Sequence, residues 1–245
     1  MTNPVKEQQE ATADKGRHRP VRSFVLRGGR VTDGQKRALD ELWPQFGIPE
    51  GDTALDLVRA FGNRQPVIME IGFGNGGATW RMAQAHPEEN YLGVEVHRAG
   101  IGRLLLALQR HGIGNARVAC ADAVEFLRER IAPGSLAGVR IYFPDPWPKK
   151  RHHKRRLIQA DFAALLASRL KEGAILHIAT DWAPYAEHML DVLRAVPEFE
   201  NLAADGGPSP RPDWRPRTKY ERRGERLGHP VFDLVFRRTL ASGEH

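Results

Sequence analysis

The sequence predicts a doubly wound α/β fold built on a mostly parallel sheet. Along residues 66–196, short apolar runs of strand length alternate with amphipathic segments of helix length. The runs are continuously apolar, which is typical of parallel strands whose two faces are both covered. A late run, VFDLVFRR at 231–238, alternates apolar and polar residues instead, and no helix follows it. We therefore expect that run to add an antiparallel strand.

The expected elements begin with a short helical segment near Lys36–Trp43, and five strand–helix pairs follow. In chain order, the pairs are Pro66–Gly72 with Gly77–Pro87, Tyr91–Val96 with Ala99–His111, Ala116–Ala121 with Val124–Ile131, Val139–Pro144 with a long helix around Leu157–Lys171, and Ala174–Thr180 with Pro184–Val196. Each strand is a run of four to eight mostly apolar residues, and each helix mixes apolar and charged residues. Strands alternating with helices in this way form parallel βαβ units.

One domain is expected to account for most of the 245 residues. Residues 1–21 are polar and basic, and we predict a disordered tail there; residues 22–60 are expected to pack as an extension on a single domain, 22–245.

The net charge of +7 and the pI near 9.8 fit a polyanionic partner without requiring one. One cysteine, Cys120, excludes an internal disulfide. With no signal peptide or membrane-length apolar run, we expect a cytoplasmic protein. The sequence does not decide between a monomer and a homodimer.

Acidic residues end the predicted strands, where open parallel sheets bind ligands. The first strand ends EIGFGNGG, in which Glu70 precedes glycines that let the backbone turn tightly at a helix N-terminus. Glu95 ends the second strand, where its carboxylate could accept both hydroxyls of a ribose. Asp122 follows the third strand and could receive an adenine amino group, and Asp145 follows the fourth.

The glycines alone do not identify the ligand. Gly72, Gly74 and Gly77 also match the dinucleotide fingerprint G-x-G-x-x-G. A nicotinamide pocket has no need of acids at four strand ends, whereas S-adenosylmethionine is a cation that benefits from acidic surroundings. The glycine loop and the four acids together therefore favour S-adenosylmethionine over NAD.

A proline on each side of Asp145 stiffens its backbone and holds its carboxylate in a fixed direction. The stretch YFPDPWPKKRHHKRR, Tyr142–Arg156, then continues into an unbroken run of Lys, Arg and His at Lys149–Arg156. Because like charges repel, the run is either a solvated helix start or a contact surface for an anionic partner. The adjacent His152 and His153 point apart and have no neighbouring acid or cysteine ligand, so we expect no metal site.

Long segments of the chain resemble the bacterial tRNA (guanine-N7)-methyltransferase family. They are PDPWPKKRHHKRRL (Pro144–Leu157) with Glu70–Gly76, Glu95 and Asp122, then TDW (Thr180–Trp182), RTKYERRGERLGHPVFDL (Arg217–Leu234) and RSFVLRGGRVTDGQ (Arg22–Gln35). The resemblance covers roughly residues 22–240. It implies a Rossmann-like class I methyltransferase with a mostly parallel seven-stranded sheet and one late antiparallel strand. It also implies transfer of a methyl group from S-adenosylmethionine to N7 of a guanine in the variable region of tRNA.

The resemblance further implies roles for individual residues. Those matched to S-adenosylmethionine binding are Glu70, Gly72, Gly74, Gly76, Glu95, Asp122 and Asp145, and Asp145 also matches the catalytic position. Those matched to substrate binding are Lys149, Asp181, Thr218, Lys219, Tyr220 and Glu221. Those matched to RNA contact are Arg151, His152, His153, Lys154, Arg155 and Arg156. The family carries Asp or Asn at the third strand end, so the charge of Asp122 is not essential.

Two other functions stay open on the residues alone. An NAD-dependent oxidoreductase would need a Tyr-x-x-x-Lys or similar proton donor, and none sits at a strand end. A non-catalytic RNA-binding module would keep basic clusters such as Lys149–Arg156 and Arg211–Arg226, but it would bind S-adenosylmethionine weakly or not at all. Each feature also has a bland explanation, as a ligand-free glycine turn, a turn acid or a solvated basic surface. The residues do not decide which role in the reaction belongs to Asp145 and which to Asp181.

Overall fold

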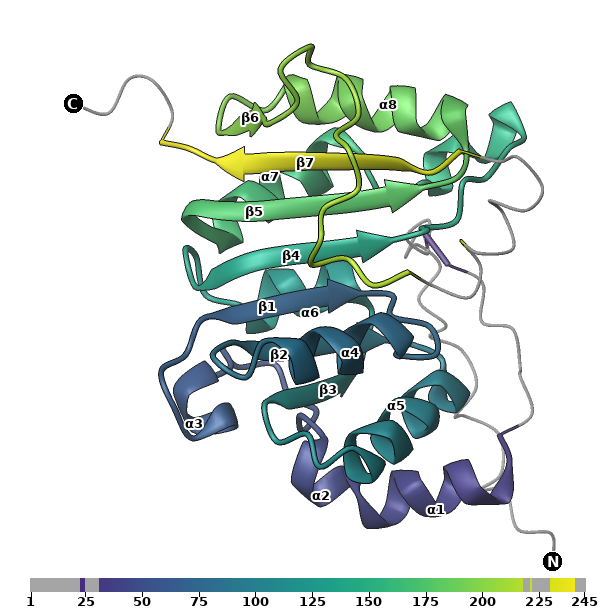
Figure 1. Cartoon of the computed structure of the whole chain (residues 1–245), viewed down its shortest axis with the longest axis vertical. Coiled ribbons are helices and arrows are strands. Elements are labelled where there is room, and N and C mark those ends of the chain that lie inside the picture. The colour runs from purple at the N-terminus through teal and green to yellow at the C-terminus, as the bar shows by residue number, and fades with distance from the viewer. Residues whose placement is uncertain (1–22, 25–30, 218–220, 222–229, 241–245) are drawn as a thin grey trace, which may run out of the picture.

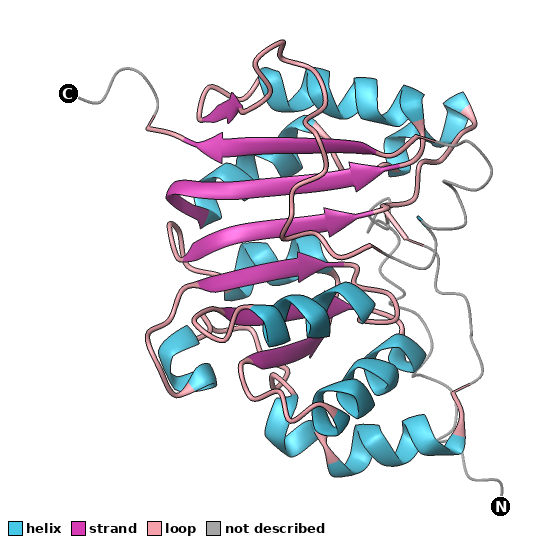
Figure 2. Cartoon of the chain, in the orientation of Figure 1, coloured by secondary structure: helices cyan, strands magenta, loops and turns pink. Residues whose placement is uncertain are grey.

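The computed structural model describes residues 23–24, 31–217, 221 and 230–240, and the described chain forms one seven-stranded sheet with helices on both faces (Figures 1 and 2). The strands are β1 Val67–Ile71, β2 Asn90–Glu95, β3 Ala116–Cys120, β4 Leu136–Tyr142, β5 Leu170–Thr180, β6 Phe199–Asn201 and β7 Phe232–Arg238. The helices are α1 Asp33–Glu41, α2 Trp43–Phe46, α3 Leu57–Phe61, α4 Gly77–Ala85, α5 Arg98–Arg110, α6 Ala123–Arg130, α7 Ala160–Arg169 and α8 Ala183–Arg194, with a 3₁₀ helix, η1, at Lys150–Arg155.

The strand order is β3-β2-β1-β4-β5-β7-β6. Strands β3, β2, β1, β4 and β5 run parallel, and β7 is antiparallel to both β5 and β6. This confirms the doubly wound fold with a late antiparallel strand. The chain builds outwards from β1 towards β3 and then returns to β4 on the other side. The topological switch point therefore lies between β1 and β4, where ligands of such sheets bind.

Two apolar layers cover the sheet. One contains the buried faces of α6, α7 and α8, for example Leu127, Leu166 and Met189, packed on β1, β4 and β5. The other contains the buried faces of α1, α4 and α5 packed on β1, β2 and β3. On that second face no described helix covers β5 and β7. The loop after β6 crosses them instead, as the yellow-green segment in Figure 1 shows.

The N-terminal extension packs as a helix on α5. Thr32 begins α1 with a capping box, because its hydroxyl accepts from the Gln35 backbone while the Gln35 side chain accepts from the Thr32 backbone. A side chain at Gly102 on α5 would meet Gln35 at 2.8 Å, so this glycine permits the close approach of the two helices. After α2, Ile48 donates its backbone N–H to Val118 and covers the outer edge of β3.

The structure differs from the sequence prediction after β4. One long helix around Leu157–Lys171 is wrong in its bounds, because η1 occupies Lys150–Arg155 and α7 begins only at Ala160. Strand β5 begins at Leu170, earlier than expected, and its register shifts beside Gly138 of β4. The resemblance implies seven strands, but the residue pattern did not locate β6, since three residues are too few for a clear alternation.

None of the described helices is both long enough and apolar enough to cross a membrane.

Candidate functional site

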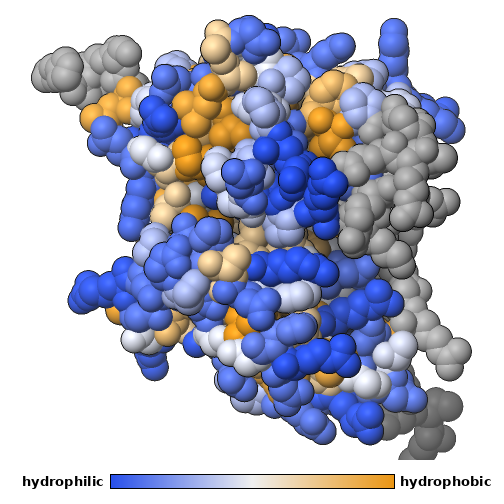
Figure 3. Space-filling view, in the orientation of Figure 1, coloured by the Kyte–Doolittle hydropathy of each residue, from blue (hydrophilic) through white to orange (hydrophobic). Residues whose placement is uncertain are grey.

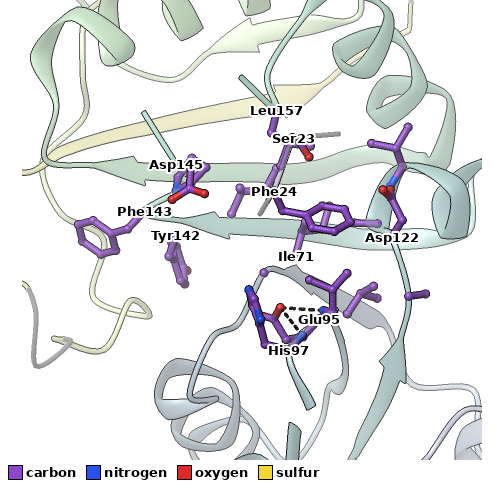
Figure 4. A pocket seen from close by; sticks show the side chains of 18 residues that line it. Ser23, Phe24, Ile71, Glu95, His97, Asp122, Tyr142, Phe143, Asp145 and Leu157 are labelled. Carbon is purple, nitrogen blue, oxygen red and sulfur yellow. Dashed lines mark hydrogen bonds between the residues drawn. The ribbon is translucent and has the colours of Figure 1, made fainter. Parts of the chain in front are cut away.

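A cleft of about 220 Å³ opens at the switch point, beyond the carboxyl ends of β1, β2, β3 and β4 (Figure 4). The loops that follow these four strands meet there, as the sequence predicts. The described residues that line it are Ser23, Phe24, Ile71, Gly72, Val94–His97, Ala121–Val124, Ile141–Asp145 and Leu157. Its charged side chains are the three carboxylates Glu95, Asp122 and Asp145, and no described Lys or Arg lines it.

The glycine loop after β1 turns through conformations that favour glycine. Gly72, Gly74 and Gly76 all have positive φ, at 68°, 56° and 69°. A side chain at Gly76 would also collide with Leu104 of α5 at 2.6 Å, so glycine is required there on two grounds. Of these three glycines, Gly72 lines the cleft, whereas the other two shape the turn behind it.

Glu95 ties the glycine loop to the end of β2. Its Oε2 accepts from the backbone N–H of Gly74 at 2.9 Å, and its Oε1 accepts from Val96 at 2.7 Å and His97 at 3.0 Å. Figure 4 shows this side chain at the lower wall of the cleft. Three backbone donors therefore fix the carboxylate at the wall of the cleft.

Glu70 lies beneath the cleft and does not line it. The Thr79 hydroxyl at the start of α4 donates to its Oε2 at 2.6 Å, and the side chain is only 2% exposed. Burial raises the pKa of Glu70 to about 7, although the Thr79 hydrogen bond and Arg140 oppose this shift. The Thr79 hydrogen bond ties the end of β1 to the helix that follows the glycine loop, and the cofactor-binding role of Glu70 stays a prediction.

Asp122 serves first as the N-cap of α6. Its Oδ1 accepts from the backbone N–H of Val124 at 2.8 Å and, at 3.4 Å, from that of Glu125. The same side chain lines the cleft on the side of β3, the strand next to the one that carries Glu95 (Figure 4). An Asn would cap the helix equally well, which fits the resemblance to a family that carries either residue here.

Asp145 is exposed and lies in a strained loop beyond β4. Phe143 and Trp147, two residues before and after it, have positive φ values of 54° and 44°. Left-handed backbone costs a residue with a side chain about 1–2 kcal/mol. Such strain persists where surrounding contacts over-determine the backbone, and it clusters at functional sites. The flanking prolines seen in the sequence are thus one part of a tightly constrained loop.

The basic run that follows forms η1 at the rim. The side chains of Lys149, Arg151, Lys154 and Arg155 are exposed. His152 and His153 are half-buried, and His152 packs edge-on against Trp147. Arg156 differs from the others in this stretch because it is only 4% exposed.

The residues matched to substrate binding are only partly brought to this end of the sheet. Asp181 is exposed directly after β5, and Asp145 lies in the loop after the neighbouring strand β4. Lys149 is exposed directly before η1. Glu221 is buried rather than presented at the cleft, and Arg215 pairs with both of its oxygens at 2.7 Å. The predictions for Thr218, Lys219 and Tyr220 lie outside the described residues.

Comparison with known proteins places the chain in a family. A model described as a putative methyltransferase matches residues 64–234. A tRNA (guanine-N(7)-)-methyltransferase of Alkalilimnicola ehrlichii is 55% identical over 238 residues, which are 96% of this chain and 100% of that protein. Another so named, from Streptomyces coelicolor, is 56% identical over 90% of this chain and 82% of its own. The chain belongs to the tRNA (guanine-N(7)-)-methyltransferase family. The resemblance seen in the sequence is thereby confirmed.

Solved structures agree with the fold of this methyltransferase. The 16S rRNA (adenine(1408)-N(1))-methyltransferase from Catenulisporales acidiphilia has a TM-score of 0.51 and 19% identity, over 77% of this chain and 97% of that one. Its W203A mutant, solved with cosubstrate SAM, has a TM-score of 0.50 over 79% of this chain and 96% of that one. At this identity the likeness concerns the fold alone.

The methyltransferase also has a buried charged cluster beside the site, which the sequence reasoning missed. Besides Glu221, Arg215 contacts Asp233 of β7, with Nη2 3.0 Å from Oδ2 and Nε 2.7 Å from Oδ1. His177 of β5 donates from Nε2 to Asp233 Oδ1 at 2.7 Å, because its Nδ1 accepts from the Trp214 indole at 3.2 Å.

The surroundings of His177 and Asp233 set the protonation states of both side chains. Burial lowers the pKa of His177 below its ordinary value, although the Asp233 hydrogen bond opposes it, so the imidazole stays neutral. Burial alone would raise the pKa of Asp233, but hydrogen bonds from His177 and Arg215 hold it below its usual range. No sequence pattern brings these residues together, since they come from a strand, a loop and a second strand far apart in the chain.

Ser23 and Phe24 were also missed as site residues, although the segment that holds them resembles the family. Phe24 projects into the cleft near Ile71 (Figure 4). The Trp147 indole donates to the Ser23 carbonyl at 3.2 Å and so ties this segment to the Asp145 loop. Among the described residues no group of three or more His, Cys, Asp or Glu side chains is arranged to hold a metal ion.

Proposed function

We propose that the protein transfers a methyl group from S-adenosylmethionine to N7 of a guanine in the variable region of tRNA. The observation that carries this proposal is the charge of the cleft, because its described lining offers three carboxylates and neither Lys nor Arg. Such a lining suits a cationic ligand and disfavours the pyrophosphate of a dinucleotide. The family of the chain, whose members are named for this reaction, gives the substrate.

The residues present fit S-adenosylmethionine. Glu95 is fixed by three backbone donors and keeps acceptor capacity for the hydroxyls of a ribose. Asp122 has a second carboxylate oxygen beside the one that caps α6, and we assign it to the adenine end. The glycine turn at Gly72 brings backbone close to the cleft. When bound, the cofactor supplies a methyl group activated on a sulfonium ion.

Guanine N7 presents a lone pair and carries no proton, so this chain needs no general base to uncover the nucleophile. Its residues act by alignment and by electrostatic stabilisation. We assign Asp145 to the stabilisation, since its carboxylate lines the cleft and its backbone is held rigid on both sides. A carboxylate fixed where positive charge develops on the purine would stabilise the transition state more than the bound reactants.

We assign Asp181 to the choice of base. A carboxylate accepts hydrogen bonds from guanine N1–H and the 2-amino group, and adenine lacks both donors. Asp181 stands at the end of β5, next to the strand that carries Asp145, so one base could meet both acids. Thr218–Tyr220 and Lys149 are proposed to bind the same nucleotide, on the strength of the family resemblance.

The exposed basic side chains of η1 are proposed to follow the RNA backbone. Arg151, Lys154 and Arg155 follow Asp145 within ten residues in the chain, and their exposed charges can meet phosphates. With tRNA as the substrate, we expect the protein to act in the cytoplasm.

Calorimetric titration with S-adenosylmethionine and with NAD tests the proposal against its alternatives. A methyltransferase binds S-adenosylmethionine and not NAD, whereas an oxidoreductase on this sheet would show the reverse. A non-catalytic RNA-binding module would bind tRNA but neither small molecule. Either of the last two outcomes would overturn the proposed function.

A further inference from the structure

Arg156 stands apart from the basic run to which it belongs in the sequence. Its side chain is 4% exposed, whereas Arg151, Lys154 and Arg155 are exposed on η1. The 3₁₀ helix ends at Arg155, and Arg156 begins the extended segment that enters the protein. A buried guanidinium cannot meet the phosphate backbone of a large polyanion without breaking the contacts that bury it.

The contacts of Arg156 join three separate parts of the site. Its Nε donates to the carbonyl of Pro146 at 3.0 Å. Its Nη2 lies 3.2 Å from Nε2 of His153 on η1. The guanidinium packs over the Tyr185 ring of α8, 4.8 Å from the ring centre. The described contacts of this side chain include no carboxylate, so its charge is directed at a carbonyl dipole and an aromatic face.

The Pro146 carbonyl matters because Pro146 directly follows Asp145. The loop is strained at Phe143 and Trp147, and its two prolines have no N–H with which to join the sheet. At its start, the Phe143 N–H donates to Ala179 of β5 at 2.7 Å. The hydrogen bond from Arg156 to the Pro146 carbonyl restrains the loop on the other side of Asp145.

We propose that Arg156 is a positioning residue that holds the Asp145 loop, and that it is not an RNA contact. This inference rests on the proposed function for its effect on turnover. A strained loop relaxes when one of its restraints is lost, and a carboxylate displaced by about 1 Å from the migrating charge can cost up to 100-fold in rate.

The test compares Arg156→Met with Arg156→Lys, using Arg151→Met as the matched control. Arg156→Met removes the charge and every donor while it keeps the bulk of the side chain. We expect kcat to fall at least tenfold, with KM for tRNA and the affinity for S-adenosylmethionine within about twofold of wild type. Arg156→Lys should recover part of kcat, because an ammonium can still donate to the Pro146 carbonyl.

The salt dependence of tRNA binding separates positioning from RNA contact. Each lost phosphate contact reduces the logarithmic salt slope by about 0.7–0.9. Arg151→Met should show this reduction, whereas Arg156→Met should keep the wild-type slope although it removes the same charge. An equal reduction in both variants would overturn the proposal.

Hydrogen–deuterium exchange supplies a readout that does not depend on activity. In Arg156→Met, the amides of Asp145, Trp147 and Lys149 should exchange faster, while those of β1 keep their wild-type rates. Uniformly faster exchange would indicate a general loss of stability and would contradict a positioning role. If the wild type transferred no methyl group to tRNA, the proposed function would fail, but the exchange and salt-slope results would still decide the role of Arg156.

Discussion

Glu70 and Glu95 end neighbouring parallel strands, and both side chains are buried. Glu95 meets three backbone N–H groups, which compensate a carboxylate for the water it has lost. Glu70 meets one hydroxyl, so burial dominates and raises its pKa to about 7. Two acids that look alike in the sequence thus have different surroundings, since Glu95 lines the cleft and Glu70 lies beneath it.

The pKa of Glu70 predicts a pH-dependent cost in stability. The folded protein holds this proton up to about pH 7, whereas the unfolded chain releases it near 4.5, the ordinary pKa of a glutamate. The folded state therefore binds more protons in that window, and the free energy of unfolding falls as pH rises through it. Glu70→Gln removes this titration. The free energy of unfolding should be measured in urea at pH 5 and at pH 8. Relative to wild type, the variant should be more stable at pH 8 than at pH 5 by about 2–3 kcal/mol. A difference independent of pH would show that Glu70 does not titrate there.

Glu95→Ala should weaken S-adenosylmethionine binding. It removes one or two charge-assisted hydrogen bonds to the ligand, about 1.5–3 kcal/mol each, and it releases the Gly74 amide from its acceptor. Affinity for tRNA should barely change. Glu95→Gln keeps one acceptor oxygen, so its affinity for S-adenosylmethionine should lie between those of wild type and Glu95→Ala. Calorimetry that finds Glu95→Ala unchanged would exclude Glu95 from the cofactor site.

At the scale of elements, β5 and β7 are joined by the buried cluster of Arg215, Asp233, His177 and Glu221 as well as by backbone pairing. The cluster replaces a helix on this face, where hydrophobic side chains come to the surface on both sides of the loop (Figure 3). Glu221 pairs with Arg215, which in turn contacts Asp233 of β7. The match of Glu221 to substrate binding stays a prediction, and in the structure this carboxylate is buried against Arg215.

Arg215→Met should destabilise the fold strongly, because it leaves two carboxylates buried without their cation. Removing one partner of a buried pair typically costs about 3–5 kcal/mol. The matched control is Arg237→Met on β7, which breaks a half-exposed pair with Glu200 of β6 and should cost less than about 1 kcal/mol. Urea unfolding of both variants measures the difference. Similar small losses in the two would show that the Arg215 cluster contributes little.

The exposed basic side chains of the 3₁₀ helix η1 are expected to contribute to the salt dependence of tRNA binding. Replacing three exposed residues, Arg151, Lys154 and Arg155, with Gln should flatten the logarithmic salt slope of tRNA binding by about two. Cofactor affinity should hold. The control replaces three exposed basic residues near the opposite edge of the sheet: Arg64, Arg128 and Lys171. Equal slopes for the two triple variants would mean that η1 is solvated surface, and that other basic segments carry the RNA.

At the scale of the whole molecule, the sequence predicted what depends on local pattern. Apolar runs fixed the strands, and because parallel strands end at one edge, the acids Glu95, Asp122 and Asp145 could be placed in one site. The rest depends on tertiary contacts. A run of basic residues does not reveal which member turns inward, so Arg156 was expected on the surface. The Arg215 cluster joins residues up to 56 positions apart, and no periodicity marks it.

The central claim, that an acid-lined cleft methylates guanine, is tested most directly by supplying labelled S-adenosylmethionine and unmethylated tRNA, followed by nucleoside analysis. Wild type should place the label in 7-methylguanosine. Asp145→Asn, which keeps the shape and removes the charge, should reduce the rate by about 100-fold while the protein stays folded. Label in another nucleoside, or no label at all, would contradict the claim, and near-normal turnover by Asp145→Asn would contradict electrostatic stabilisation by this carboxylate.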